Sequence, residues 1–256
     1  MPETLSTLSP VAGHSSEPTG TDYQAKYLAY ELTRRHGSDS VDRLTTALAD
    51  AQVDLNPHQI DAALFAFRSP FSKGAILADE VGLGKTIEAG LLLSQKWAER
   101  KRRLLVIGPA NLRKQWSQEL EDKFHLPSRI LEGKTFNEAI RGGNLNPFET
   151  DEVILCSFQF ARSKDAYVRQ TPWDLVVIDE AHRLRNVYKP GNKIARAIKD
   201  AIAPYPKVLL TATPLQNTLL ELYGLVSIID DHAFGDLQSY RNRFGRLNDD
   251  DDFAEL

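Results

Sequence analysis

A glycine-rich segment in the first half of the chain could bind phosphate. Gly82 and Gly84 would let backbone N–H groups approach phosphate oxygens without obstruction from a Cβ atom. Lys85 could reach the outer phosphates of a nucleotide, and the Thr86 hydroxyl could coordinate Mg²⁺. The candidate phosphate loop comprises Asp79, Glu80, Val81, Gly82, Leu83, Gly84, Lys85 and Thr86; its first residue departs from the usual pattern, which has glycine there. The alternative is a glycine-rich turn that happens to precede a helix.

Two carboxylates follow a second apolar run. Asp179 and Glu180 come directly after Leu175–Ile178. Ligands of open parallel sheets bind at the carboxyl ends of the strands, so these side chains could face the phosphates. Asp179 could hold Mg²⁺, and Glu180 could polarise an attacking water. Acidic residues also end many strands without a catalytic role, but together with the phosphate loop they indicate phosphoryl hydrolysis.

The elements around these residues alternate between strand and helix patterns. Such alternation predicts crossover units in a mostly parallel sheet with helices on both faces, an α/β three-layer sandwich. The predicted strands are Ala75–Ala78, Leu104–Ile107, Val153–Cys156, Leu175–Ile178 and Val208–Thr211, and the predicted helices are Thr86–Arg100, Asn111–Phe124 and Asn192–Ala203. A small helical element, with helices at 22–35 and 41–53, is expected before them.

Composition sets broad limits. The chain has 256 residues, a net charge of −4 and one cysteine, Cys156, so neither an internal disulfide nor a thiolate metal cluster is possible. No run is long enough to span a membrane and the N-terminus does not resemble a signal peptide, so we expect a cytoplasmic protein. The charges are uneven, with an acidic tail at Asp249–Asp252. Basic residues cluster at Lys96, Arg100, Lys101, Arg102, Arg103, Arg113 and Lys114, either as solvated surface or as a nucleic-acid contact.

The segment Leu209–Asn217, which reads Leu-Leu-Thr-Ala-Thr-Pro-Leu-Gln-Asn, resembles the Swi/Snf-like translocases among the superfamily-two helicases. Gly108–Trp116 followed by Glu119 resembles another motif of that family. The sequence Asp-Glu-Ala-His at Asp179–His182 occurs in DEAH-box RNA helicases too. The Thr-Ala-Thr-Pro segment, however, differs from the pattern of that family. The resemblance covers about residues 55 to 231 and is closest to bacterial members.

This resemblance implies a RecA-like (P-loop) lobe that binds ATP and Mg²⁺. It assigns Gln59 to reading the adenine. It assigns two roles to a further set of residues: contact with nucleic acid, and the coupling of that contact to the state of the nucleotide phosphates. These residues are Pro109, Asn111, Arg113, Thr211 and Thr213. Such motors need a second RecA-like lobe that supplies arginines to the site, which we expect in a C-terminal part or another subunit. The predicted organisation is a disordered tail (1–20), a helical entry element (21–54), the lobe (55–233) and the start of an incomplete continuation (234–256).

The implied function is that of the ATP-binding lobe of a DNA-dependent ATPase that translocates on double-stranded DNA, with hydrolysis weak in this chain alone. Two alternatives stay open. One is the ATPase motor of a restriction or phage-defence system. The other is a non-catalytic module that regulates a partner through ATP occupancy.

Overall fold

The computed structural model describes residue 26 and residues 56–69, 73–78, 84–215 and 218–244. The chain divides into two compact units, residues 1–37 and 38–256, and every described residue except Lys26 belongs to the second. Most of the predicted phosphate loop, from Asp79 through Glu80, Val81 and Gly82 to Leu83, lies outside the described residues. The same holds for the expected helices at 22–35 and 41–53, apart from the helical Lys26, and for the acidic tail.

Six parallel strands form one sheet, in the order β1-β6-β5-β2-β4-β3. The strands are β1 (Gly74–Leu77), β2 (Leu104–Gly108), β3 (Ser128–Ile130), β4 (Val153–Ser157), β5 (Leu175–Ile178) and β6 (Lys207–Leu210). The α/β fold with a parallel sheet is therefore confirmed. The five predicted strands lie within one residue of their observed positions, and β3 is an additional edge strand.

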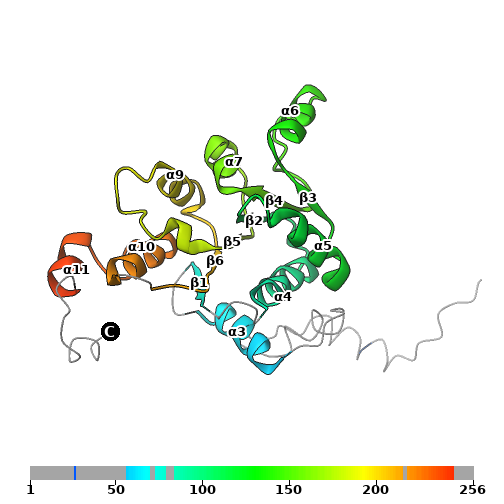
Figure 1. The fold of residues 1–256 in the computed structure, drawn as a ribbon. Coiled ribbons are helices and arrows are strands. Elements are labelled where there is room, and N and C mark those ends of the chain that lie inside the picture. Colours follow the sequence, from blue (N-terminus) through cyan, green and yellow to red (C-terminus); the bar gives the residue numbers. More distant parts are fainter. Residues whose placement is uncertain (1–25, 27–55, 70–72, 79–83, 216–217, 245–256) are drawn as a thin grey trace, which may run out of the picture. The chain divides into compact units, whose positions relative to one another are not determined.

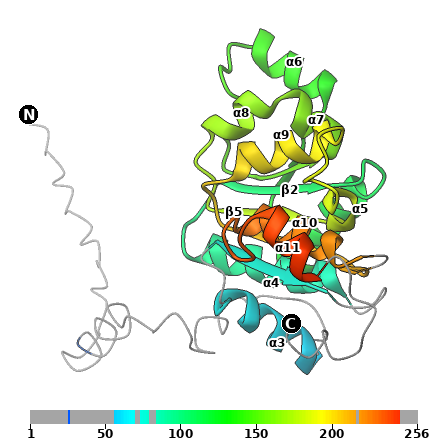
Figure 2. The ribbon, with the colours of Figure 1, turned by 90° about the vertical axis from the view of Figure 1, so that its left-hand side faces the viewer.

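Each central strand buries both of its faces, because alternate residues point into different layers. Leu104 and Val106 of β2 belong to one apolar core, while Leu105 and Ile107 belong to the other. The first core lies under α3 (Pro57–Phe67), α4 (Lys85–Ala98) and α5 (Arg113–Phe124). Figures 1 and 2 show these three helices together on one side of the sheet.

The second core lies under five further helices and one 3₁₀ turn. They are α6 (Gly133–Arg141), α7 (Phe158–Ser163), α8 (Asp165–Gln170), the 3₁₀ turn η2 (Ala181–Leu184), α9 (Lys193–Ile202) and α10 (Leu219–Ile229). The Ser157 hydroxyl caps α7 by accepting from the Phe160 N–H, and the Asn192 side chain caps α9 by accepting from the Ala195 N–H. Figure 2 shows α8 and α9 across the sheet from α4. Two layers of helices thus enclose the sheet.

The last described helix, α11 (Leu237–Phe244), packs on α10 through aromatic side chains. Tyr240 is buried, with its ring 4.9 Å from the ring of Tyr223, and its hydroxyl donates to the Leu219 carbonyl at 3.2 Å. The predicted domain boundaries stay predictions. Within the described ranges, no helix is both long and apolar enough to cross a bilayer.

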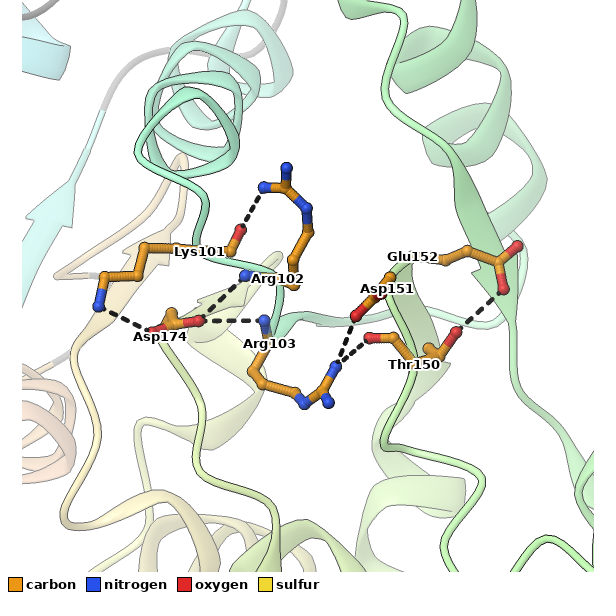
Figure 3. Close-up of polar contacts among 7 residues, drawn as sticks. All are labelled: Lys101, Arg102, Arg103, Thr150, Asp151, Glu152 and Asp174. Atoms are coloured by element: carbon orange, nitrogen blue, oxygen red, sulfur yellow. Dashed lines mark hydrogen bonds and ion pairs between the residues drawn. The ribbon is translucent and has the colours of Figure 1, made fainter.

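Three members of the basic cluster, Lys101, Arg102 and Arg103, lie between α4 and β2 at the amino end of the sheet and contact neighbouring segments. The Asp174 carboxylate before β5 accepts from the backbone N–H groups of Arg102 and Arg103, both at 3.1 Å, and lies 3.6 Å from the Lys101 ammonium (Figure 3). The Arg103 guanidinium donates to Thr150 O at 2.6 Å and to Asp151 at 3.2 Å. Arg102 stacks over the Trp97 ring at 4.0 Å. These residues therefore align neighbouring strands, and they lie at the edge opposite the carboxyl ends.

Asp174→Ala is expected to lower the free energy of unfolding by about 1–3 kcal/mol, because it leaves two partly buried N–H groups without their acceptor. The matched control is Asp151→Ala, which removes an ion pair from a side chain that is 82% exposed and should cost about 0.5 kcal/mol or less. Urea unfolding followed by circular dichroism measures both. Equal effects of the two substitutions would show that Asp174 does not align the strands.

Lys207, the first residue of β6, is buried with 0% exposure, and its ammonium donates to the Ala203 carbonyl at 3.2 Å. Lys73 donates to the same carbonyl at 3.4 Å. Burial, with a smaller effect from the Lys73 charge, lowers the pKa of Lys207 to about 8. The folded state therefore favours the neutral amine more strongly than the unfolded state does.

This difference predicts how stability changes with pH. The lowered pKa of Lys207 gives a stabilising contribution that is present in full above pH 10.5 and is lost as the pH falls through about 8. The difference corresponds to about 3 kcal/mol, since one pKa unit is about 1.4 kcal/mol. We expect the unfolding free energy of the unaltered chain, relative to Lys207→Met, to rise between pH 8 and pH 10.5. A difference that stays constant across that range would contradict the burial of a charged amine.

Candidate active site

A pocket of about 340 Å³ lies at the carboxyl edge of the sheet, between the start of α4, one face of α5 and the end of β5. It is lined by Gly84, Lys85, Thr86, Ile87, Leu112, Gln115, Trp116, Glu119, Lys123, Asp179 and Glu180. The structure therefore brings together the described end of the predicted phosphate loop and the predicted acidic pair, although 93 residues separate Thr86 from Asp179 in the sequence.

Lys85 and Thr86 are the first two residues of α4. Gly84 precedes them as the N-cap, in the left-handed region at φ 92°. Only glycine suits this position, because an added Cβ would also lie 2.3 Å from the Gln59 side-chain nitrogen. The amino end of α4, with its positive dipole, thus faces the pocket beside Lys85, as anion binding requires.

Asp179 is 8% exposed and is held at the end of β5 by several contacts. Its N–H donates to Ile107 O at 2.8 Å. Its Oδ2 accepts from the indole Nε1–H of Trp116 at 2.8 Å, and its Oδ1 accepts from the Glu180 N–H at 2.8 Å. Gly108 packs behind it, where an added Cβ would lie 3.3 Å from the Asp179 Cβ. The carboxylate is therefore fixed in one orientation.

Burial raises the pKa of Asp179 above its ordinary value, against the opposing effect of the hydrogen bonds from Trp116 and the Glu180 N–H. A nearby cation would favour the ionised form and offset the cost of burial. Thr86, whose side chain carries a hydroxyl, lines the same pocket. One carboxylate and one hydroxyl, completed by phosphate oxygens, suit the oxygen shell of Mg²⁺. The donor set therefore fits the expected metal.

Glu180 lines the pocket and adopts the left-handed conformation at φ 51°, which is uncommon for a residue with a side chain. Its Oε2 lies 3.0 Å from the His182 Nδ1. That nitrogen makes no hydrogen bond of normal geometry, so the contact is an ion pair only when the imidazole is protonated. The strained turn places two successive carboxylates in one pocket.

Gln59, the predicted adenine contact, is buried in the first turn of α3 beside Gly84. Its side-chain oxygen accepts from the Asn56 N–H at 3.2 Å. It packs against the base of the phosphate loop rather than lining the pocket. Its role with adenine stays a prediction.

The residues predicted to contact nucleic acid follow strands β2 and β6 at the same edge of the sheet. Arg113 begins α5, donates to Ala110 O at 3.1 Å and lies 3.4 Å from Glu132. Thr211 is buried, and its hydroxyl oxygen accepts from the Thr213 N–H at 3.2 Å. Pro109, Asn111, Arg113, Thr211 and Thr213 do not line the pocket. Their contact with nucleic acid stays a prediction.

One face of α5 is the part of the site that sequence reasoning missed. Gln115 donates to Glu119 at 2.8 Å, and Lys123 donates to the same carboxylate at 3.1 Å, so the three side chains form a polar ladder along the pocket. Trp116 beside them reaches Asp179. The recurrence of Leu112, Gln115 or Trp116, Glu119 and Lys123 every three to four residues is the pattern that could have revealed this shared face.

Comparisons with known proteins show the family to which the chain belongs. The profile of the SNF2-related domain matches residues 23–255. Similar relatives are the RNA polymerase-associated proteins RapA of Yersinia enterocolitica (serotype O:8 / biotype 1B) and Yersinia pseudotuberculosis (serotype O:1b), each 32% identical over 214 residues. These alignments cover 82% of this chain but only 22% of the relatives' length.

Two solved structures share the fold. The Sulfolobus solfataricus SWI2/SNF2 ATPase core domain gives a TM-score of 0.64 at 23% identity, over 87% of this chain and 45% of that one. The same ATPase core in complex with double-stranded DNA gives 0.61 at 23% identity, over 76% and 40%. With the profile match and the parallel sheet, these findings place the chain in the Swi/Snf-like, SNF2-related family of superfamily-two helicases, as an N-terminal RecA-like lobe.

Proposed function

We propose that this chain binds ATP with Mg²⁺ in the pocket at the carboxyl edge and acts as the ATP-binding lobe of a double-stranded DNA translocase. The observation that carries the proposal is the convergence of Lys85 and Thr86, at the start of α4, with Asp179 and Glu180, at the end of β5, in one pocket. Phosphoryl transfer needs a cationic phosphate cradle and a metal-binding carboxylate side by side.

Each side chain has a distinct part in this reaction. The N–H groups at the start of α4 and the Lys85 ammonium bind the phosphates. Thr86 and Asp179 are the residues that hold Mg²⁺, which when bound neutralises charge on the phosphates. Glu180 orients and polarises the attacking water, since its carboxylate lines the pocket beside Asp179.

Fast hydrolysis needs cationic groups from a second lobe. Among the described residues that line the pocket, the cations are Lys85 and Lys123, and Lys123 already pairs with Glu119 at 3.1 Å. An arginine that reaches the transferring phosphoryl group contributes several orders of magnitude to the rate. The relatives are more than four times as long as the matched region, which leaves room for such a lobe in proteins of this kind. We therefore expect weak hydrolysis by this chain alone.

Double-stranded DNA is the nucleic acid along which we propose that the translocase moves. Support comes from the similar Sulfolobus ATPase core, whose structure was solved in complex with double-stranded DNA, and from the RapA relatives, whose name associates them with RNA polymerase. The segments after β2 and β6 lie at the same edge of the sheet as the pocket, which supports the proposal that Arg113 and Thr213 contact DNA phosphates near the nucleotide. Binding through a few local phosphate contacts is compatible with a net charge of −4.

Two equilibrium titrations test the proposal. The first follows binding of a fluorescent ATP analogue with and without Mg²⁺, and competition by unlabelled ATP and GTP. We expect ATP to bind, Mg²⁺ to tighten binding, and ATP to compete better than GTP. Equal competition would refute the adenine contact of Gln59, and failure to bind either nucleotide would refute the nucleotide site.

The second titration measures binding of two unrelated double-stranded DNA sequences at several salt concentrations. Contacts to phosphates predict equal affinity for the two sequences and a logarithmic affinity that falls linearly with the logarithm of the salt concentration. A strong preference for one sequence, or affinity that does not depend on salt, would contradict a translocase lobe that binds the phosphate backbone of DNA.

A further inference from the structure

The contact between Trp116 and Asp179 joins α5 directly to the acidic strand end. The indole Nε1 lies 2.8 Å from Oδ2, and both side chains are buried, Trp116 with 2% and Asp179 with 8% exposure. An indole N–H can only donate, so Oδ2 of Asp179 is the acceptor of this hydrogen bond. A hydrogen bond to a charged acceptor in a site shielded from water is among the stronger ones in proteins.

The remaining contacts of the carboxylate leave it available to a ligand in the pocket. Oδ1 accepts the Glu180 N–H, so each oxygen has one fixed donor. An ionised carboxylate offers about four lone-pair sites, so each oxygen keeps further capacity to coordinate. Gly108 closes the space behind Asp179. Trp116 is thus the one side chain found to fix Oδ2 in the described part of the chain.

We propose that Trp116 is a positioning residue for the Mg²⁺ site, which holds the Asp179 carboxylate in a single orientation and thereby strengthens Mg²⁺ binding to the ATP-loaded chain. This inference rests on the proposed function. Hydrogen-bond partners behind metal ligands fix the ligand's orientation, and their loss lowers metal affinity by about 10- to 100-fold. Trp116 is such a hydrogen-bond partner of Asp179.

The chain provides a matched control in Trp173. This tryptophan is also buried, and its Nε1–H also donates over 2.8 Å, to the backbone carbonyl of Val168. It belongs to the core on the opposite face of the sheet. Trp116→Phe and Trp173→Phe therefore remove the same atoms and a hydrogen bond of the same length, but only the first removes a partner of Asp179.

The test measures ATP affinity over a Mg²⁺ titration, with each substitution made in the full chain. We expect Trp116→Phe to require about tenfold more Mg²⁺ to tighten ATP binding, with ATP affinity in the absence of Mg²⁺ unchanged. Trp173→Phe should change neither quantity. A Mg²⁺ requirement that is the same in both variants would overturn the proposal, and so would an equal loss of ATP affinity with and without Mg²⁺.

A second measurement needs no substitution at Trp116. The chain has three tryptophans, so its ¹⁵N-labelled indole groups give three resonances, assigned by Trp97→Phe and Trp173→Phe. On addition of Mg²⁺ to the ATP complex, the Trp116 resonance should move and the Trp173 resonance should not. A Trp116 resonance that stays in place while Mg²⁺ tightens ATP binding would overturn the positioning role alone. If the unaltered chain binds no ATP, the proposed function fails as well.

Discussion

Lys85→Ala is expected to weaken ATP binding by about 100-fold. Lys85 lies at the start of α4 in the pocket, where its ammonium can pair with phosphate oxygens. Hydrogen bonds to charged groups contribute about 1.5–3 kcal/mol, and about 1.4 kcal/mol corresponds to a factor of ten in affinity. Titration with a fluorescent ATP analogue measures the change, and circular dichroism checks that the fold is retained.

Lys123→Ala is the matched control for this substitution. Lys123 lines the same pocket, but its ammonium is paired with Glu119 at 3.1 Å on a partly exposed face of α5. Its removal should change ATP affinity by about threefold or less, because a surface ion pair contributes about 0–1 kcal/mol. Equal losses for both variants would mean that the phosphates are held by the general positive charge of the pocket. The assignment of Lys85 to the phosphates would then be wrong.

Gly224→Ala is expected to destabilise the chain by about 3 kcal/mol or more, at the upper end of the costs of overpacking. An added Cβ would lie 1.7 Å from the Arg185 carbonyl oxygen, and that oxygen belongs to the backbone and cannot rotate away. The substitution therefore pushes α10 away from the segment that contains Arg185, which follows Asp179 and Glu180 in the chain. Arg185 also pairs with Glu221 of α10 at 3.4 Å, so the displacement would strain this ion pair.

Urea unfolding tests this expectation, with Gly191→Ala as the control. An added Cβ at Gly191 would meet nothing within 4 Å, and its backbone lies outside the left-handed region. That substitution should change the unfolding free energy by about 0.5 kcal/mol or less. Helix propensity alone favours alanine over glycine at position 224 by about 1 kcal/mol. A stabilised Gly224→Ala variant would therefore show that α10 does not pack closely on Arg185.

Much of the fold was predictable because the central strands are short apolar runs with helix patterns between them. Leu175–Ile178 was found at its observed bounds. The edge strand β3 was not, because Ser128–Ile130 has three residues and no alternation of apolar and polar positions. The order of the strands, with β6 between β1 and β5, depends on packing between distant segments that local patterns do not report.

The candidate site, like the fold, was predictable from the sequence only in part. The types and spacing of Lys85, Thr86, Asp179 and Glu180 indicated their chemistry, and the structure places all four in one pocket. The role of Trp116 was missed because its partner lies 63 residues away. The backbone contacts of the basic cluster were not predictable for a similar reason. Arg102 and Arg103 were expected to face solvent or nucleic acid, and the structure adds that their backbone N–H groups donate to Asp174, which lies more than 70 residues away.

Steady-state ATP hydrolysis by this chain, measured with and without double-stranded DNA, tests whether hydrolysis needs a second lobe. Glu180→Gln serves as the control for contaminating activity, since it removes the group that polarises water and leaves Lys85, Thr86 and Asp179 in place. We expect the chain to bind ATP while its hydrolysis stays close to that of Glu180→Gln, even with DNA. Strong hydrolysis that DNA stimulates and Glu180→Gln abolishes would contradict the need for a second lobe.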